Sequence, residues 1–306
     1  MKFNTQYSHL FSKRLFRRIV SGTMVLLLLA SLYDYVDLDD QLYAAWIKST
    51  TSEETKNASI WLSRYHLDYQ ANLEGIRNNL SGITYSQDSK SYWAVINNPQ
   101  VLLELDEDLR IIRQIKLHNF EDTEAVASAG MGKLVIADER DQSIVIAPIT
   151  TTTTSLDKKQ LKRLTLNTHG GDNKGFEGIT VDTQKSLIYV ARERDPMMLL
   201  SIRGLLSDDQ TLEIDTHHSI YVEELYLDDL SGLHFDEKSG NLLLLSDESK
   251  ALAEITTEGK KISYMDLISG FHGLINNIPQ AEGVTIGPDR SIIIVSEPNY
   301  IYRFRQ

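Results

Sequence analysis

The chain of 306 residues contains no cysteine. This absence excludes disulfide bonds, thiolate zinc sites, a cysteine nucleophile and a lipid-modified lipoprotein cysteine. Basic residues are also few, 31 against 43 acidic residues, and the formal net charge is −12. Because nucleic-acid binding depends on clustered lysine and arginine that displace counterions from phosphates, this charge argues against a nucleic-acid partner. It favours cationic ligands or metal ions.

Several catalytic signatures are absent as well. The sequence has no Walker loop, no Rossmann glycine fingerprint after a strand, no HExxH and no G-x-S-x-G elbow. With 42% apolar and 24% charged residues, the chain is able to bury a large core as one big domain or two ordinary ones.

A basic segment followed by an apolar run stands at the N-terminus. Basic residues concentrate near the end of residues 1–18, and residues 19–38 include the run MVLLLLASLY. This order is typical of a secretory signal or an uncleaved signal anchor, and no small-x-small cleavage site follows the leucines. The sequence therefore predicts a cytoplasmic segment at 1–18 and a transmembrane signal anchor at 19–38. By the positive-inside rule, the chain from about residue 40 onward lies outside the cytoplasm, with the inner membrane as partner. A cleaved signal peptide is the alternative.

Residues 39–59 are polar, with KSTTSEETKNAS at their centre, and show no sustained apolar period. We interpret them as a stalk. The domain that follows is expected to span residues 60–306.

One pattern occurs five times in residues 60–306. The copies open with LSGITYSQ, TEAVASAG, FEGITVDT, LSGLHFDE and AEGVTIGP, and the Ser or Glu that opens each is, in order, Ser81, Glu124, Glu177, Ser231 or Glu282. The spacings are 43, 53, 54 and 51 residues. A period near 50 residues indicates a repeated supersecondary unit.

Each copy contains a short alternating strand, a polar turn, a strongly apolar strand such as LIYV or IIIV, and usually two more alternating strands. This pattern predicts an all-β fold, a β-propeller with five four-stranded blades. A sixth, degenerate blade within residues 205–226 is the alternative. The last copy has only three strands, so we expect an N-terminal strand at residues 59–69 to close the ring and remove an exposed sheet edge.

Several long motifs resemble a known family. NNLSGITY, LVIADERDQ, KGFEGI, YVARERDP, LLLLSDES and IVSEPNYIYRF occur in this order. Over about residues 60–306 they resemble the SdiA-regulated (YjiK-like) family of Gram-negative bacteria. The resemblance implies a membrane-anchored β-propeller that faces the periplasm, and it implies no particular activity.

The repeated Ser or Glu is predicted to lie at one mouth of the central channel, because the first strand of each blade lines that channel. The glycine after it fits where the inner strands converge. The second strands return to the same face, so their last residues join this surface. The candidate ligand-binding residues are Ser81, Ser231, Asp138, Glu139, Arg140, Arg192, Glu193, Asp247, Glu248 and Glu297, with Arg194 beside them.

Carboxylates brought together at one mouth repel each other and require a cation, a proton or neighbouring arginines. Oxygen ligands from Glu124, Glu177, Glu282 and Asn97 would suit a hard ion such as Ca²⁺. The alternative is structural: these side chains accept backbone N–H groups or pair with arginines, and hold one blade to the next.

Histidines occur in the connectors that lead into the three glutamate-bearing strands. They are His118, His169 and His272, and one of them could act as a general base because the unperturbed pKa of a histidine side chain lies near working pH. We include His169 and His272 among the candidate ligand-binding residues. A solvated loop histidine is the alternative.

Two functions follow from these observations. The first is a binding or interaction module that presents the acidic mouth to a periplasmic ligand or protein. The second is a Ca²⁺-dependent hydrolase, phosphoesterase-like or lactonase-like, with its site at the channel mouth; it rests on analogy with propeller enzymes.

Overall fold

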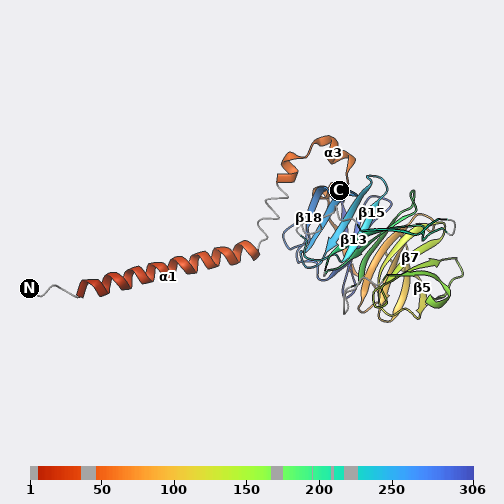
Figure 1. Ribbon diagram of the computed structural model, residues 1–306, viewed down its shortest axis with the longest axis horizontal. Helices are drawn as coiled ribbons and strands as arrows, with labels where there is room; N and C mark the ends of the chain where they lie inside the picture. Colours follow the sequence, from red (N-terminus) through yellow and green to blue (C-terminus); the bar gives the residue numbers. More distant parts are fainter. Residues whose placement is uncertain (1–5, 36–45, 167–174, 195, 208–209, 217–226) are drawn as a thin grey trace, which may run out of the picture. The chain divides into compact units, whose positions relative to one another are not determined.

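The computed structural model describes residues 6–35, 46–166, 175–194, 196–207, 210–216 and 227–306 (Figure 1). The chain divides into two compact units, Met1–Thr50 and Thr51–Gln306.

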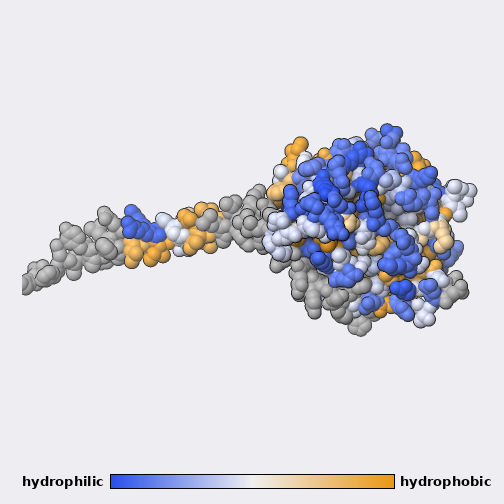
Figure 2. Space-filling model, turned by 90° about the horizontal axis from the view of Figure 1, so that it is seen from above, coloured by the Kyte–Doolittle hydropathy of each residue, from blue (hydrophilic) through white to orange (hydrophobic). Residues whose placement is uncertain are grey.

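In the first unit, helix α1 spans Gln6–Tyr35 and includes most of the predicted transmembrane segment. Large apolar side chains between Leu15 and Leu28 are exposed on it, and they are orange in Figure 2. No helix within the described part of the chain is both long enough and apolar enough to cross a membrane. The predicted transmembrane span at residues 19–38 is therefore not supported.

The second unit begins with short helical segments. Helix α3 spans Glu53–Ala58, inside the predicted stalk, and Ser52 caps it because its hydroxyl accepts a hydrogen bond of 3.2 Å from the Thr55 amide. The 3₁₀ helix η1 (Leu62–Arg64) follows. Both segments precede the first strand of the propeller.

The described strands form five sheets, each with four antiparallel strands in up-down order, which we call blades 1 to 5. Blade 1 contains β2 (Leu80–Ser86), β3 (Ser91–Asn97), β4 (Gln100–Leu105) and β5 (Ile111–His118). Blade 2 contains β6 (Thr123–Gly130), β7 (Lys133–Asp138), β8 (Ser143–Pro148) and β10 (Lys162–Thr165).

The remaining blades follow the same order. Blade 3 contains β11 (Phe176–Asp182), β12 (Leu187–Arg192), β13 (Met198–Arg203) and β14 (Glu213–Thr216). Blade 4 contains β15 (Gly232–Asp236), β16 (Asn241–Ser246), β17 (Ala251–Thr256) and β18 (Lys261–Asp266). Blade 5 contains β19 (Ala281–Ile286), β20 (Ile292–Ser296), β21 (Tyr300–Arg305) and, from the other end of the chain, β1 (His66–Asn72).

The five-bladed all-β propeller predicted from the repeats is therefore confirmed. The described residues between 205 and 226 supply only β14, the outer strand of blade 3, and no sixth sheet forms within the described ranges. Blade 1 gains a short fifth strand, β9 (Ser155–Asp157). This strand follows the threonine-rich loop at residues 150–154, after β8 of blade 2, and pairs in parallel with β5. The 3₁₀ helix η2 (Lys158–Gln160) then leads to β10.

Burial follows the position of each strand in its blade. All six residues of β16 are buried, because this strand lies inside its sheet with neighbouring blades on both faces. In the outer strand β5, Ile115 and Leu117 are buried while Gln114 and Lys116 are exposed. The apolar side chains form clusters between adjacent blades, one of which joins blades 2 and 3. These interblade cores hold the ring together.

The ring closes as predicted, by an N-terminal strand. β1 pairs antiparallel with β21, with His66 opposite Arg305 and Asn72 opposite Tyr300. The strand occupies residues 66–72 rather than 59–69, because the earlier part of that range forms η1. From the antiparallel order, β1 begins on the face where the innermost strands end.

Candidate functional site

The innermost strands β2, β6, β11, β15 and β19 contact one another in a ring around the central axis. They approach closely at the glycine of the repeat. A Cβ added to Gly82 would lie 2.6 Å from Ala125 Cα, and one added to Gly283 would lie 2.8 Å from Ser81 O. These distances are too short for any side chain, so glycine is required at these two positions. In blade 2 the equivalent residue is Ala125.

We call the channel end where the innermost strands begin the glutamate mouth, defined by Glu124, Glu177 and Glu282. Glu177 and Glu282 line a small cavity on the axis, with a volume of about 10 Å³. This space is enough for about one water molecule. Neither carboxylate makes a hydrogen bond or an ion pair with any residue that the structure describes.

Charge repulsion adds to the burial of these two groups. Burial and repulsion from Glu124 and other carboxylates raise the pKa of Glu177 well above its usual range. The same causes raise the pKa of Glu282 to about 9. By surface area both side chains are only half-buried, but protein surrounds their carboxylates closely enough that burial is the largest cause. The carboxyl group of Glu282 therefore holds a proton near pH 7 unless a cation replaces it, and no described residue compensates the ionised form of either group.

Glu124 has a different environment. Asn97, at the end of β3, donates a hydrogen bond of 2.9 Å from Nδ2 to Glu124 Oε1. Burial raises the pKa of Glu124 to about 7, although this hydrogen bond opposes the shift. The Ser81 hydroxyl, in a side chain only 1% exposed, also lies close enough to lower the pKa of Glu124. Ser81 Oγ and Asn97 Oδ1 have no hydrogen-bond partner among the described residues.

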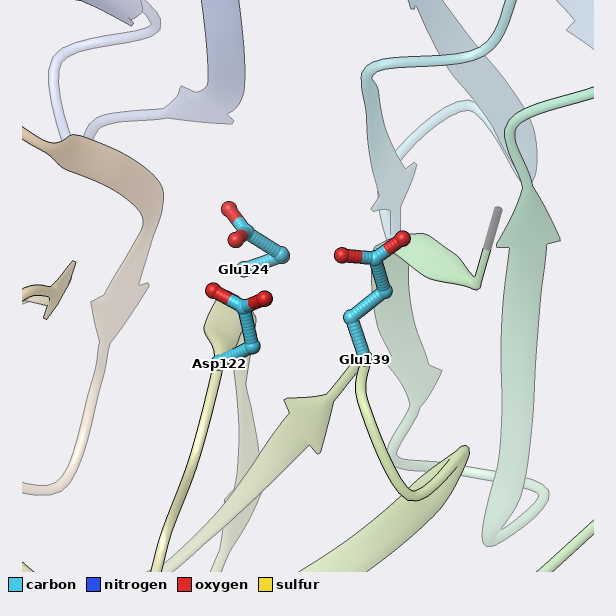
Figure 3. Close-up of side chains that lie close together, drawn as sticks. All are labelled: Asp122, Glu124 and Glu139. Carbon is cyan, nitrogen blue, oxygen red and sulfur yellow. The ribbon is translucent and has the colours of Figure 1, made fainter. Parts of the chain in front are cut away.

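Glu124 belongs to a group of three carboxylates that could bind a metal ion. Carboxylate oxygens of Asp122, Glu124 and Glu139 all lie within 4.8 Å of one another. Figure 3 shows Asp122 and Glu124 side by side from the start of β6, with Glu139 facing them from the end of β7. Glu124 and Glu139 are buried, and Asp122 is half-buried.

Several predicted residues hold blades and connectors in place. Glu139 Oε1 accepts a hydrogen bond of 2.8 Å from the Gly175 amide, at the start of blade 3. Asp247 Oδ1 accepts one of 2.9 Å from the Ala281 amide, at the start of blade 5. The end of a second strand thus binds the start of the next inner strand.

Asp138 also has a structural role. It is fully buried, and its carboxylate accepts a hydrogen bond of 3.0 Å from the Asp122 amide and one of 2.7 Å from the Lys158 ammonium group. It therefore fixes the connector that carries Asp122 into the mouth.

Arg140 and Arg194 pair with acidic residues other than the three glutamates of the mouth. Arg140 is exposed and pairs with Asp122 at 2.9 Å, and Arg194 pairs with Glu193 and Glu248. Arg192 is buried at the end of β12. Burial raises the pKa of Glu297, which follows β20, and Glu297 in turn helps to raise the pKa of Glu282.

Ser231, just before β15, is 4% exposed, and its hydroxyl lies 3.5 Å from Leu245 O, at the limit for a hydrogen bond. It occupies the position in blade 4 that glutamate occupies in blades 2, 3 and 5.

The histidines behave differently from the prediction. His272 lies beside the start of β1: its Nδ1 is 2.7 Å from Tyr65 O, and its ring is 5.9 Å from that of His66. It is therefore at the outer edge of blade 5 rather than at the mouth. His118 ends the outer strand β5 and is exposed. His169 lies outside the described residues.

Two acidic residues at this face were missed by the sequence analysis. Asp122 stands two residues before Glu124, so that both side chains of an extended segment point the same way, and the run EDTE was the available signal. Asp229 is 3% exposed and accepts hydrogen bonds from the Ser246 hydroxyl and, at 3.1 Å, from the Glu248 amide. It lies outside the repeated motif, which gave no signal for it.

The fold and this site define a five-bladed β-propeller with an acidic channel mouth. The chain belongs to the SdiA-regulated family, whose model matches residues 57–305.

Solved structures with a similar fold include glutaminyl cyclase from Myxococcus xanthus, with a TM-score of 0.52, 14% identity, and coverage of 79% of this chain and 95% of that chain. A nidogen/laminin complex gives a TM-score of 0.47 at 15% identity, with 72% and 73% covered. A streptogramin B lyase gives 0.46 at 14% identity, with 81% and 99% covered. At these identities the similarity concerns the fold alone.

Proposed function

We propose that this propeller is a binding module whose glutamate mouth holds a hard divalent cation, with Ca²⁺ as the best-suited ion. The observation that carries the proposal is the pair Glu177 and Glu282. Both carboxylates lie at the mouth without a hydrogen bond or ion pair from the described residues, while their pKa values are raised by burial and by repulsion from neighbouring carboxylates. A bound cation would relieve this repulsion.

A second observation points to the same ion. Ser81 Oγ is buried without a partner beside Glu124, and Asn97 Oδ1 is also without a partner. Together with Asp122, Glu124 and Glu139 they offer only oxygen ligands. Oxygen-only sets suit Ca²⁺ and Mg²⁺, whereas zinc sites in proteins usually include histidine or cysteine.

The binding function takes precedence over the hydrolase because a metal-dependent hydrolase also needs a residue to activate water. Neither described connector histidine, His118 or His272, lies at the mouth. The hydrolase therefore remains a prediction. The periplasmic location, the inner-membrane partner and a periplasmic ligand or protein also remain predictions.

Isothermal titration calorimetry tests the proposal. The purified full chain is treated with EDTA and then titrated with Ca²⁺ and, separately, with Mg²⁺. We expect the unmodified protein to bind Ca²⁺ with a dissociation constant on the order of 10⁻⁴ M or lower, as in other modules with this type of ligand set. Combined Glu177→Gln and Glu282→Gln substitutions should weaken binding at least tenfold, and so should Asp122→Asn. Glu258→Gln, in an exposed hairpin turn, is the matched control and should leave binding unchanged. Absence of any binding to the unmodified chain would overturn the proposal.

A further inference from the structure

The propeller has a second cavity on its axis, at the face where the innermost strands end. Its volume is about 420 Å³, and residues from all five blades line it. This volume is in the range of small-molecule sites, which are concave and contain a few fixed polar groups. We call it the opposite mouth, defined by Thr84, Thr180, His234, Asp236 and Arg290.

The two mouths are separate. Apolar side chains of the innermost strands line the small cavity between them: Ile83, Val126, Ile179, Leu233 and Val284. No residue lines both the small cavity and the opposite mouth. A ligand at the opposite mouth would therefore not contact the carboxylates of the glutamate mouth.

Near this cavity, threonine hydroxyl groups on three of the innermost strands form hydrogen bonds to the next blade. Thr84 Oγ1 accepts a hydrogen bond of 3.3 Å from the Ser128 amide. Thr180 Oγ1 accepts one of 2.8 Å from the Phe235 amide. In blade 5, Thr285 Oγ1 accepts a hydrogen bond of 3.1 Å from the Tyr85 amide. In each case the threonine binds the backbone of the next blade.

Two blades depart from this series: the equivalent residue is Ala127 in blade 2 and His234 in blade 4. Nδ1 of His234 lies 3.5 Å from Thr285 Oγ1, at the limit for a hydrogen bond, and the ring lines the opposite mouth. Nε2 has no hydrogen-bond partner in the described part of the chain. Burial lowers the pKa of His234 to about 4, so the ring is neutral near pH 7 and offers one donor and one acceptor. A structural role would be served by threonine, as in blades 1, 3 and 5.

Beside His234 a guanidinium group is held in a fixed position. Arg290 forms two hydrogen bonds with Asp236, Nη1 to Oδ1 at 2.5 Å and Nη2 to Oδ2 at 3.0 Å. Asp236 is fixed in turn by the amide and hydroxyl of Ser239 at 3.0 and 2.7 Å. Tyr65, just before β1, donates a hydrogen bond of 2.9 Å to the Arg290 carbonyl. The pair uses two of the five guanidinium N–H groups and leaves the others for a ligand.

The charges of the cavity wall select the class of ligand. Its lining includes three carboxylates, Asp88, Asp236 and Glu237, and two cations, Lys238 and Arg290. A multiply charged anion would meet the carboxylates, and a cation would meet the two basic groups. The wall instead combines a hydrogen-bond donor (Arg290), acceptors (the carboxylates) and groups that can do both, such as the threonine hydroxyls and His234. A neutral ligand with many hydroxyl groups satisfies such a wall, since each hydroxyl donates and accepts.

We infer that the opposite mouth binds a neutral saccharide of one or two rings, with His234 and Arg290 as the groups that recognise its hydroxyls. A site built to bond hydroxyl groups discriminates strongly, because its buried polar atoms lose their partners when the ligand lacks them. This inference does not depend on the cation proposed for the glutamate mouth.

The test uses the full chain and defined probes. Glucose, galactose, N-acetylglucosamine and maltose represent neutral saccharides, glucose 6-phosphate the anionic class and glucosamine the cationic class. Ligand-observed saturation-transfer NMR identifies binders, and calorimetric titration measures their affinity. We expect at least one neutral saccharide to bind, and to bind more tightly than its charged analogue.

His234→Thr restores the residue of three other blades, and we expect it to weaken saccharide binding at least tenfold. His234→Gln, which keeps a donor and an acceptor, is the second variant should threonine disturb folding, and it should weaken binding less. His66→Thr, an identical change at an exposed residue of β1, is the matched control and should bind as the unmodified chain does. Failure of all neutral saccharides to bind, or equal binding by His234→Thr, would overturn the inference.

Discussion

The carboxylate of Glu254 accepts a hydrogen bond of 2.8 Å from the backbone amide of Ile60, which lies 194 residues earlier in the chain. Glu254 is on β17 and has no exposed surface. Its second oxygen accepts the Trp61 amide at 3.0 Å, and the hydroxyl of Ser263 donates to that same oxygen at 2.6 Å. One buried side chain thus fixes the segment that leads into the closing strand.

The first prediction concerns this carboxylate. Glu254→Ala removes the acceptor of several buried donors, and leaving such groups without partners costs about 3–5 kcal/mol. We expect a loss of this size in the free energy of unfolding, measured by urea denaturation. Glu254→Gln retains one acceptor oxygen and should cost less than the alanine variant. A loss below about 1 kcal/mol for Glu254→Ala would show that solvent replaces these hydrogen bonds.

The second prediction concerns ring closure. Deleting residues 1–50 removes the first unit and leaves β1 intact. Deleting residues 1–72 also removes β1 and exposes the hydrogen-bonding edge of β21. Because an unpaired edge strand promotes aggregation, we expect the longer deletion to aggregate and the shorter one to remain monodisperse in size-exclusion chromatography. Equal solubility of the two would contradict closure by β1.

The third prediction concerns the convergence of the inner strands. In Gly283→Ala, the new methyl group would lie 2.8 Å from Ser81 O and 2.9 Å from Ile83 N, both backbone atoms of blade 1. We expect a loss of about 1–3 kcal/mol in the free energy of unfolding from this overpacking. Ala125→Gly, at the equivalent position of blade 2, creates no clash and should cost about 1 kcal/mol or less. A ranking in the opposite order would refute the role given to the repeated glycine.

The fourth prediction concerns pH. The pKa of Glu282 is raised in the folded protein to about 9, from a value of 4.5 when the residue is free of its surroundings. At low pH the group is protonated in both states and has no effect on stability. As pH rises above 4.5, the unfolded chain loses this proton first, so the folded state becomes less stable relative to it up to about pH 9.

Glu282→Gln removes this penalty. In EDTA, the variant should match the unmodified chain near pH 4 to 5 and exceed it by ~2 kcal/mol or more near pH 9, as measured by chemical denaturation. Ca²⁺ should reduce the difference, because a cation stabilises the ionised carboxylate. A difference that stays constant from pH 5 to 9 would show that Glu282 ionises normally in the folded protein.

The sequence by itself determined the blades. Antiparallel strands that are adjacent in the chain make each blade, and the alternation of apolar and polar residues that specifies them is local. The repeated Ser or Glu with its glycine could therefore be counted five times, and the missing fourth strand of the last copy could be sought at the other terminus. The error in that strand's range arose because Ile60 and Trp61 are held by Glu254 from blade 4, a contact that no local pattern encodes.

Only the tertiary structure decided the roles of the side chains at the two mouths. Glu139 and Glu177 look equivalent in the sequence as acids at the ends of repeated strands. In the structure Glu139 accepts a hydrogen bond from the Gly175 amide, whereas the carboxylates of Glu124, Glu139 and Glu282 repel that of Glu177. His272 and His234 were separated in the same way, since one contacts Tyr65 at the outer edge and the other lines the axis. These partners come from different blades, and the distance between blades is set by the packing of their apolar faces. The chemistry of each mouth is therefore a property of the closed ring and cannot be assigned from a single repeat.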